Sequence, residues 1–454
     1  MSNKTENQNS FLEKTFKLTE NKTNVKTEII AGLTTFLTMA YIIAVNPAFL
    51  ATTGMDQGAL VTATCLAAGL ATIMMGLYAN MPLALASGMG LNAFFAFYVC
   101  GVLGISWQIA LTAVFVEGII FIILSLTGIR ELVVNSIPDS LKIAVSAGIG
   151  LFIAFIGLEG AKIVVADPDT LVVMGNLKDP RAFIALIGVV IIGILLHKKV
   201  KGAVLWGILA CTFIAWIYAL IIGPSNAAEL YGIYLPDKIT ALYSIKPIAF
   251  KLDFSVFKNS SSLLTFATIV ITFLFVDFFD TVGTLVGVAS KAKLFDKDGK
   301  VLRAKQALLT DAVGTTVGSL LGVSTVTTYV ESSAGVAEGG RTGLTAVTTG
   351  LLFILAMFFA PIFMAIPGCA TAPALIIVGL LMMQNITKID FHDLTEGIPA
   401  FLTILLMPLT YSIATGLMFG VISYVIFNIF SEKKKVSITM FVLAILFVLK
   451  IIFL

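Results

Sequence analysis

The stretch Ser324–Gly343 reads STVTTYVESSAGVAEGGRTG, and an earlier stretch, Pro82–Phe97, reads PLALASGMGLNAFFAF. Each is hydrophobic but interrupted by Gly, Ser or Thr, and each opens with an extended segment, Leu83–Ser87 or Thr325–Val330, before turning helical. Lipid cannot satisfy the free N–H and C=O groups of such breaks, so both stretches must lie inside protein or line a cavity. The two stretches therefore predict a pair of broken helices in a membrane protein.

The composition agrees with a membrane location. Of 454 residues, 58% are hydrophobic and 12% are charged, and that charged share is about half of the share in a soluble domain. The chain has too little polar surface for an ordinary soluble enzyme, and its net charge of +3 is too small to indicate nucleic-acid binding. The four cysteines lie far apart, and there are only two histidines. We therefore expect no enzyme activity, no metal site and no cofactor.

Apolar runs of about 20 residues, long enough to cross a bilayer, follow one another along the chain. With the two interrupted stretches they predict fourteen crossings, and the Lys and Arg residues between them place the N-terminus in the cytoplasm. A last apolar stretch, 436–454, is either a fifteenth crossing or an interfacial helix. The predicted crossings are 28–50, 59–79, 82–100, 105–128, 140–163, 181–197, 202–223, 262–286, 305–322, 323–340, 346–366, 370–386, 396–411 and 413–430.

A long loop divides these crossings into two sets of seven, and the third crossing of each set is the broken one. Because seven is odd, the second set enters the membrane from the opposite face, which is typical of transporters built as inverted repeats. The alternative is that both interruptions are Gly-rich packing faces between helices. The predicted parts are a cytoplasmic tail (1–26), a first repeat (27–223), an extracellular loop (224–261), a second repeat (262–430) and a C-terminal tail with an apolar segment (431–454).

Four carboxylates fall inside apolar spans: Glu117, Asp277, Asp280 and Glu331. Burying a carboxylate in a membrane costs at least about 2.5–3.5 kcal/mol, so each is a candidate functional group. Asp277 and Asp280 share roughly one helix face, whereas Glu331 and Asn92 lie near the starts of the two half-helices. Carboxyl and amide groups there predict a mid-membrane pocket for a flat heterocycle with N–H donors and ring acceptors. A structural hydrogen bond is the alternative for each acid and the favoured one for Glu117.

At four motifs the sequence resembles the purine-transporting, AzgA-like branch of the nucleobase-cation symporter-2 group. The likeness runs from about residue 15 to 430, and the last two motifs are long and specific. The motifs are AGLTTFLTMAYIIAVNP (Ala31–Pro47), SGMGLNAFF (Ser87–Phe95), FVDFFDTVGTLVG (Phe275–Gly287) and TTYVESSAGVAEGGRTGLTAV (Thr327–Val347).

The resemblance implies an all-α polytopic membrane protein with fourteen segments in a 7+7 inverted repeat, of which segments 3 and 10 are broken and carry short β-strands. A core domain (about 27–130 and 262–366) would hold the substrate, and a gate domain (about 136–223 and 370–430) would also form a homodimer contact. The implied activity is proton-coupled uptake of a purine base, with guanine and hypoxanthine favoured, across a bacterial plasma membrane by an elevator-type movement. Sodium stays open as the coupling ion.

The resemblance also assigns site residues. Relatives that carry uracil have a His four residues after the helix-8 acid, where this chain has Thr284. The alternatives are an adenine-selective permease of the same family and an anion transporter of the same fold, which would require a cationic site. The residues assigned to the substrate are Asn92, Asp280, Glu331, Gly90 and Ser332, and those assigned to the coupling proton are Asp280, Glu331 and Asp277.

Overall fold

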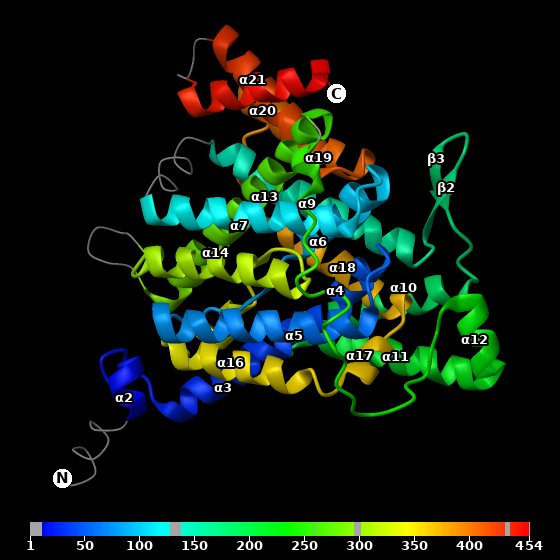
Figure 1. Ribbon diagram of the computed structural model, residues 1–454. Helices are drawn as coiled ribbons and strands as arrows, with labels where there is room; N and C mark the ends of the chain where they lie inside the picture. The colour runs from blue at the N-terminus through cyan, green and yellow to red at the C-terminus, as the bar shows by residue number, and fades with distance from the viewer. Residues whose placement is uncertain (1–10, 128–137, 259, 295–300, 432–435, 454) are drawn as a thin grey trace.

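The computed structural model describes residues 11–127, 138–258, 260–294, 301–431 and 436–453 (Figure 1). Parts of the two predicted tails, 1–10 and 432–435 with residue 454, lie outside the described residues. Length and apolar composition alone identify eight membrane-crossing helical segments in the described chain, and four apolar helical segments are shorter. The eight are Val25–Ala51, Gln57–Ala79, Trp107–Thr127, Asp139–Gly160, Pro180–His197, Ala203–Ile222, Gly368–Lys388 and Ile413–Ser431.

Side-chain caps start several helices of the first half. Asn24, Asp56 and Asp179 each accept a hydrogen bond from a backbone N–H two or three residues later, which satisfies a donor that the helix leaves free. The elements are α2 (Phe11–Phe16), α3 (Val25–Met39), α4 (Ile42–Ala51), α5 (Gln57–Met74), the π-helix η1 (Met75–Ala79), β1 (Leu85–Ser87), α6 (Met89–Ala93), the π-helix η2 (Phe94–Val102), α7 (Trp107–Thr127), α9 (Asp139–Gly160), β2 (Val164–Asp167), β3 (Leu171–Met174), α10 (Pro180–His197), α11 (Ala203–Ile222) and α12 (Pro224–Tyr231).

From residue 224 onward the structure differs from the sequence expectations in several places. The stretch 224–261, expected as a loop, contains α12 and η3, α13 is longer than the expected span 262–286, and the expected crossing 346–366 is divided between α16 and α17. The elements are the 3-10 helix η3 (Ser255–Lys258), α13 (Ser260–Ala292), α14 (Ala304–Leu321), β4 (Val326–Thr328), α15 (Ser332–Ala337), α16 (Gly343–Ala356), α17 (Ala360–Met364), α18 (Gly368–Met383), the 3-10 helix η4 (Gln384–Lys388), α19 (Leu394–Leu409), α20 (Ile413–Ser431) and α21 (Ile438–Phe453).

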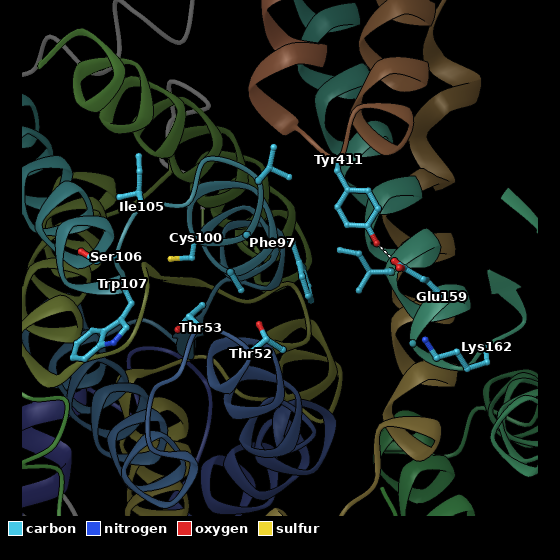
Figure 2. Close-up of a pocket in the computed structure, with 15 residues that line it drawn as sticks. Thr52, Thr53, Phe97, Cys100, Ile105, Ser106, Trp107, Glu159, Lys162 and Tyr411 are labelled. Carbon is cyan, nitrogen blue, oxygen red and sulfur yellow. Dashed lines mark hydrogen bonds between the residues drawn. The ribbon is translucent and has the colours of Figure 1, made fainter. Parts of the chain in front are cut away.

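The long helices pack in two groups, each drawn from both halves of the chain. In the first group, α5 packs on α4, α14 and α16, while α7 packs on α13 and α14, and α3 on α15 and α16. In the second group, α9 packs on α18 and α19, and α10 packs on α11 and α18. The blue α5 beside the yellow α16 in Figure 1 shows this mixing of halves. The two groups face each other across a cavity whose lining is drawn in Figure 2.

The two interrupted stretches meet as a buried two-stranded sheet. β1 and β4 run antiparallel, with Leu85 opposite Thr328, Ala86 opposite Thr327 and Ser87 opposite Val326. All six residues are buried. The pairing satisfies one edge of each strand, and the segments that follow the two strands, Gly88–Gly90 and Tyr329–Glu331, line one cavity inside the protein.

The outer edges of these strands are completed by two threonines from neighbouring helices. Thr72 of α5 donates to Leu85 O and accepts from Leu85 N, both at 2.9 Å. Thr315 of α14 donates to Val326 O at 2.9 Å and accepts from Val326 N at 3.2 Å. Each hydroxyl thus takes the place of a neighbouring strand, because backbone N–H and C=O groups in an apolar interior need hydrogen-bond partners.

Candidate functional site

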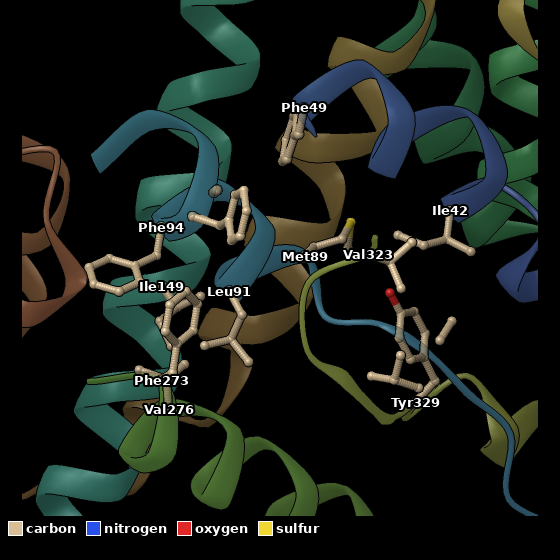
Figure 3. Packing of buried hydrophobic residues seen from close by; sticks show 14 of the residues in the cluster. Ile42, Phe49, Met89, Leu91, Phe94, Ile149, Phe273, Val276, Val323 and Tyr329 are labelled. Atoms are coloured by element: carbon tan, nitrogen blue, oxygen red, sulfur yellow. The ribbon is translucent and has the colours of Figure 1, made fainter. Parts of the chain in front are cut away.

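A cavity of about 70 Å³ lies where the two broken segments meet. Its walls come from the starts of α6 and α15, from α13, from the junction of α3 and α4, and from α18 of the second group. Figure 3 shows the broken segments side by side, with Met89 and Tyr329 among the buried side chains between them. The lining residues are Tyr41, Gly88, Met89, Gly90, Asp280, Thr284, Thr328, Tyr329, Val330, Glu331, Val378 and Met382.

Two carboxylates converge on this cavity from different elements. Glu331 directly precedes α15, and its Oε1 accepts a hydrogen bond from Tyr41 Oη at 2.7 Å. Asp280 comes from α13, and its carboxylate accepts no hydrogen bond from the described residues. Both side chains are half-buried. Two acids with unused lone pairs therefore face one small cavity.

Gly90, which lines the cavity, packs closely against the second helix group. A Cβ built on Gly90 would lie 2.5 Å from Ile149 Cγ2 of α9, which is well inside van der Waals contact. Only a glycine at this position lets α6 approach α9 so closely. Gly90, Asp280 and Glu331 are thus the three predicted site residues that the structure brings to the cavity wall.

The structure places the other predicted residues behind the wall. Asn92 is fully buried, and its Oδ1 accepts from Ser87 Oγ at 2.8 Å, while its Nδ2 has no acceptor among the described residues. Ser332 Oγ accepts from Ala84 N at 3.0 Å. Asn92 and Ser332 therefore brace the broken segments in this conformation rather than lining the cavity.

Asp277 belongs to a buried polar network around β4 and not to the cavity. Thr281 Oγ1 lies 2.9 Å from Asp311 Oδ2, 2.8 Å from Thr327 Oγ1 and 3.4 Å from Asp277 Oδ1. Thr315 Oγ1 also lies 3.5 Å from Asp277 Oδ2. The network ties α13, α14 and β4 together directly behind Asp280.

Sequence reasoning did not assign Tyr41 or the two α18 residues, Val378 and Met382, to the site. Tyr41 lies within the first quoted motif, and a lone Tyr in an apolar run was a usable signal because a buried Tyr hydroxyl needs a partner. Val378 and Met382 carry no local signal, since an apolar residue of a crossing helix looks the same whether it faces lipid or a cavity.

The cavity suits a polar, uncharged ligand with hydrogen-bond donors. Among the described residues its lining contains two acids and several hydroxyl groups but no Lys, Arg or His. An ionised carboxylate only accepts hydrogen bonds, and a protonated one also donates. At about 70 Å³ the cavity is smaller than the roughly 300–1,000 Å³ of most ligand pockets, so the walls must separate to admit a ring system.

Paired broken segments around a small acid-lined cavity, within a bundle of apolar helices, are typical of membrane transporters. The chain belongs to the Permease family Xan_ur_permease, the nucleobase-cation symporter-2 group, whose family model matches residues 26–449. The family resemblance noted in the sequence is thereby confirmed.

Similar proteins extend this result. The guanine/hypoxanthine permease PbuG of Bacillus subtilis is 45% identical over 459 residues, covering 97% of this chain and 99% of that protein. The adenine permease AdeP of Escherichia coli is 42% identical over 443 residues, covering 97% and 96%. The transmembrane domain of the cyanobacterial bicarbonate transporter BicA is similar in fold, with a TM-score of 0.63, 16% identity and coverage of 87% and 97%.

Proposed function

We propose that the protein imports purine nucleobases together with protons, with guanine and hypoxanthine preferred. The observation that carries this proposal is the convergence of Asp280 and Glu331 on one cavity between the broken segments. The names of the similar permeases, for guanine and hypoxanthine in one case and adenine in the other, support the ligand class.

In the proposed complex the two acids hold opposite edges of the base. One ionised carboxylate accepts from a ring N–H, while the other, protonated, donates to a ring nitrogen or carbonyl oxygen. Gly90 lets the backbone of α6 approach the ring, and the backbone at Ser332 closes the other side. Asn92, whose amide N–H groups have no described acceptor, turns toward the base once the cavity opens.

Proton coupling follows from the cost of a buried charge. A carboxylate left unpaired in a low-dielectric site costs several kcal/mol. The site therefore moves across the membrane when both base and proton are bound, and does not move when only one of them is bound. The coupling proton binds to Asp280 or Glu331, and Asp277, which lies behind them, is the third carboxylate that could bind it. Sodium in its place would make uptake depend on sodium at constant pH.

For the movement we propose an elevator in which a core domain (27–130 and 262–366) slides against a gate domain (136–223 and 370–430). The two packing groups of helices support this division. The proposal includes fourteen crossings as a 7+7 inverted repeat, a cytoplasmic N-terminus, an extracellular stretch 224–261, a homodimer through the gate domain and a place in the bacterial inner membrane.

The test is uptake of labelled hypoxanthine, guanine and adenine by proteoliposomes under an inward proton gradient, without sodium. We expect Asp280→Asn and Glu331→Gln to lose most uptake, and Asp139→Asn, an exposed residue at the start of α9, to transport normally. Wild-type uptake in both cavity variants would refute the proposal. Competition by unlabelled adenine, guanine, hypoxanthine, xanthine and uracil then ranks the substrates.

An adenine-selective permease is the second candidate, because the AdeP relative is nearly as similar as PbuG. It predicts that adenine alone competes strongly. An anion transporter is disfavoured, since the cavity lining holds two acids and no cationic side chain; the bicarbonate transporter shares the fold only.

A further inference from the structure

A second cavity, about 740 Å³ in volume, opens between the two helix groups (Figure 2). Thr52, Phe97 and Trp107 border it from the first group, and Glu159 and Tyr411 from the second. Because Val25–Ala51 is one crossing, the cavity near Thr52 lies on the membrane face opposite the start of α3. We call this cavity the vestibule.

The vestibule leads toward the acid-lined cavity along a single broken helix. Gly90 of α6 lines the inner cavity, and Phe97 of η2, which continues α6, lines the vestibule. Seven residues separate them, which is roughly 10 Å of helix. A molecule in the vestibule is therefore about two helical turns from Asp280 and Glu331.

Aromatic rings from both groups close the inner end of the vestibule. Phe97 contacts Phe49 of α4 edge to face at 5.3 Å, and it contacts Tyr411 at 6.4 Å between ring centroids. Tyr411, which follows α19, also packs edge-on against Phe152 and Phe155 of α9, at 5.4 and 5.7 Å. The chain of rings crosses from one helix group to the other.

The same residues offer a matched set of contacts for a flat heterocycle. Phe97, Tyr411 and Trp107 are only partly buried, so ring faces remain available for stacking. Tyr411 Oη donates to Glu159 Oε2, which fixes the carboxylate at the wall, and Glu159 Oε1 receives no hydrogen bond from the described residues. A ring N–H can therefore donate to Glu159 while the ring stacks on Phe97 or Tyr411.

We propose that the vestibule is a first binding site for a planar heterocycle with N–H donors, occupied before the ligand reaches the inner cavity. The proposal rests on the proposed function, because it assumes that such a ligand is carried. It adds a site of its own residues: Phe97 and Tyr411 for stacking, and Glu159 as acceptor. Separation of Phe97 from Tyr411 would then pass the ligand inward.

Cys100 supplies a reporter for the test. It lines the vestibule and is partly exposed, whereas Cys65, Cys211 and Cys369 are at most 3% exposed. The full-length protein in liposomes is treated with a charged, membrane-impermeant methanethiosulfonate, and the rate of thiol modification is measured with and without hypoxanthine or guanine. Cys100→Ser must abolish the rapid modification, which assigns the signal.

We expect either base to slow modification of Cys100 in the wild type, and equally in Asp280→Asn, where the inner site is impaired. Phe97→Ala and Glu159→Gln should each raise the base concentration for half-protection about tenfold. Phe254→Ala, an exposed ring outside the vestibule, is the matched control and should leave it unchanged.

Three results would overturn the vestibule site: no modification of Cys100, no protection by either base, or protection that vanishes in Asp280→Asn. Uptake measured on the same liposomes separates the two proposals. Uptake without protection rejects the vestibule site and leaves the proposed function standing, whereas protection without uptake of any base rejects the proposed function.

Discussion

Lys201 Nζ lies 2.6 Å from Glu338 Oε2, and this ion pair joins the two helix groups. Lys201 belongs to the turn between α10 and α11, and Glu338 directly follows α15. Because α9 ends at the vestibule with Glu159, and α10 is the next crossing, the end of α10 and the ion pair lie on the opposite face. In the same turn, a Cβ on Gly202 would lie 3.0 Å from the carbonyl oxygen of Leu37 in α3. The groups are therefore in contact on one face while the vestibule separates them on the other.

Breaking this pair should shift the population of the protein between two conformations, one open at the vestibule face and one open at the opposite face. The side chains are 52% and 28% exposed, and an exposed pair contributes about 0.2–1 kcal/mol, so Lys201→Ala or Glu338→Gln should change the ratio of the two populations by up to about fivefold. Modification of Cys100 from the vestibule side should slow accordingly. The charge swap Lys201→Glu with Glu338→Lys should restore the rate.

The control for this experiment is Lys142→Ala, which removes an ion pair within α9 alone, to Asp139. It should leave the modification rate of Cys100 unchanged. If both Lys201→Ala and Glu338→Gln match the wild type, the contact at Lys201 does not hold the groups together.

Gly90 and Ile149 make a steric prediction. A methyl group at position 90 would overlap Ile149 Cγ2, and overpacking of this kind costs about 1–3 kcal/mol. Gly90→Ala should therefore lower uptake roughly tenfold or more, and adding Ile149→Ala should recover part of it. Gly193→Ala is the control, since a Cβ on Gly193 meets nothing within 4 Å. Normal uptake by Gly90→Ala would show that α6 need not approach α9.

Glu28 makes a prediction about stability. The fully buried carboxylate accepts from the backbone N–H groups of Arg341, Thr342 and Thr345 at 2.8, 3.3 and 3.2 Å, and from Thr345 Oγ1 at 2.6 Å. It thereby joins the start of α3 to the start of α16. Glu28→Ala leaves these donors unsatisfied and should cost about 2–4 kcal/mol, whereas Glu28→Gln should cost less.

Thermal unfolding in detergent, followed by intrinsic fluorescence, measures this effect. Glu229→Ala, which removes an exposed carboxylate on α12, should leave the midpoint unchanged. Equal midpoints for Glu28→Ala and the wild type would mean that the hydrogen bonds of Glu28 contribute nothing to stability.

The broken segments could be predicted from the sequence because their signal is local. Gly, Ser and Thr within apolar runs mark breaks wherever the runs end up, and acids in such runs are costly enough to stand out. Glu331 and Asp280 could be predicted for this reason, and both line one cavity. The direction of Asn92 could not be predicted, because its amide turns to Ser87, and that choice depends on how β1 is held.

The sequence analysis also missed the β2–β3 hairpin, whose strands pair from Val164 with Met174 to Asp167 with Leu171. A signal was present: two short runs that each contain a Val–Val pair flank a polar turn, and Asp167 Oδ1 accepts from the backbone N–H groups of Asp169 and Thr170. The signal is weak, since each strand has only four residues.

No local pattern reveals that Thr72 and Thr315 complete the strand edges, because each role depends on pairing between β1 and β4, more than 200 residues apart. This arrangement yields the most specific prediction. Thr72→Val removes one donor and one acceptor and leaves Leu85 N and O buried without partners. At about 1–3 kcal/mol for each group, the free energy of unfolding should fall by about 2–6 kcal/mol.

Thr72→Ser keeps the hydroxyl and should stay within about 1 kcal/mol of the wild type, because only a methyl group is lost. Thr315→Val should resemble Thr72→Val, since the two threonines occupy matching places in the two halves. Thr410→Val is the control: Thr410 directly follows α19, and its exposed hydroxyl donates to Leu406 O in the last turn of that helix. If the unfolding midpoint of Thr72→Val is as high as that of Thr410→Val, water or another group must satisfy the N–H and C=O groups of Leu85 at the edge of β1.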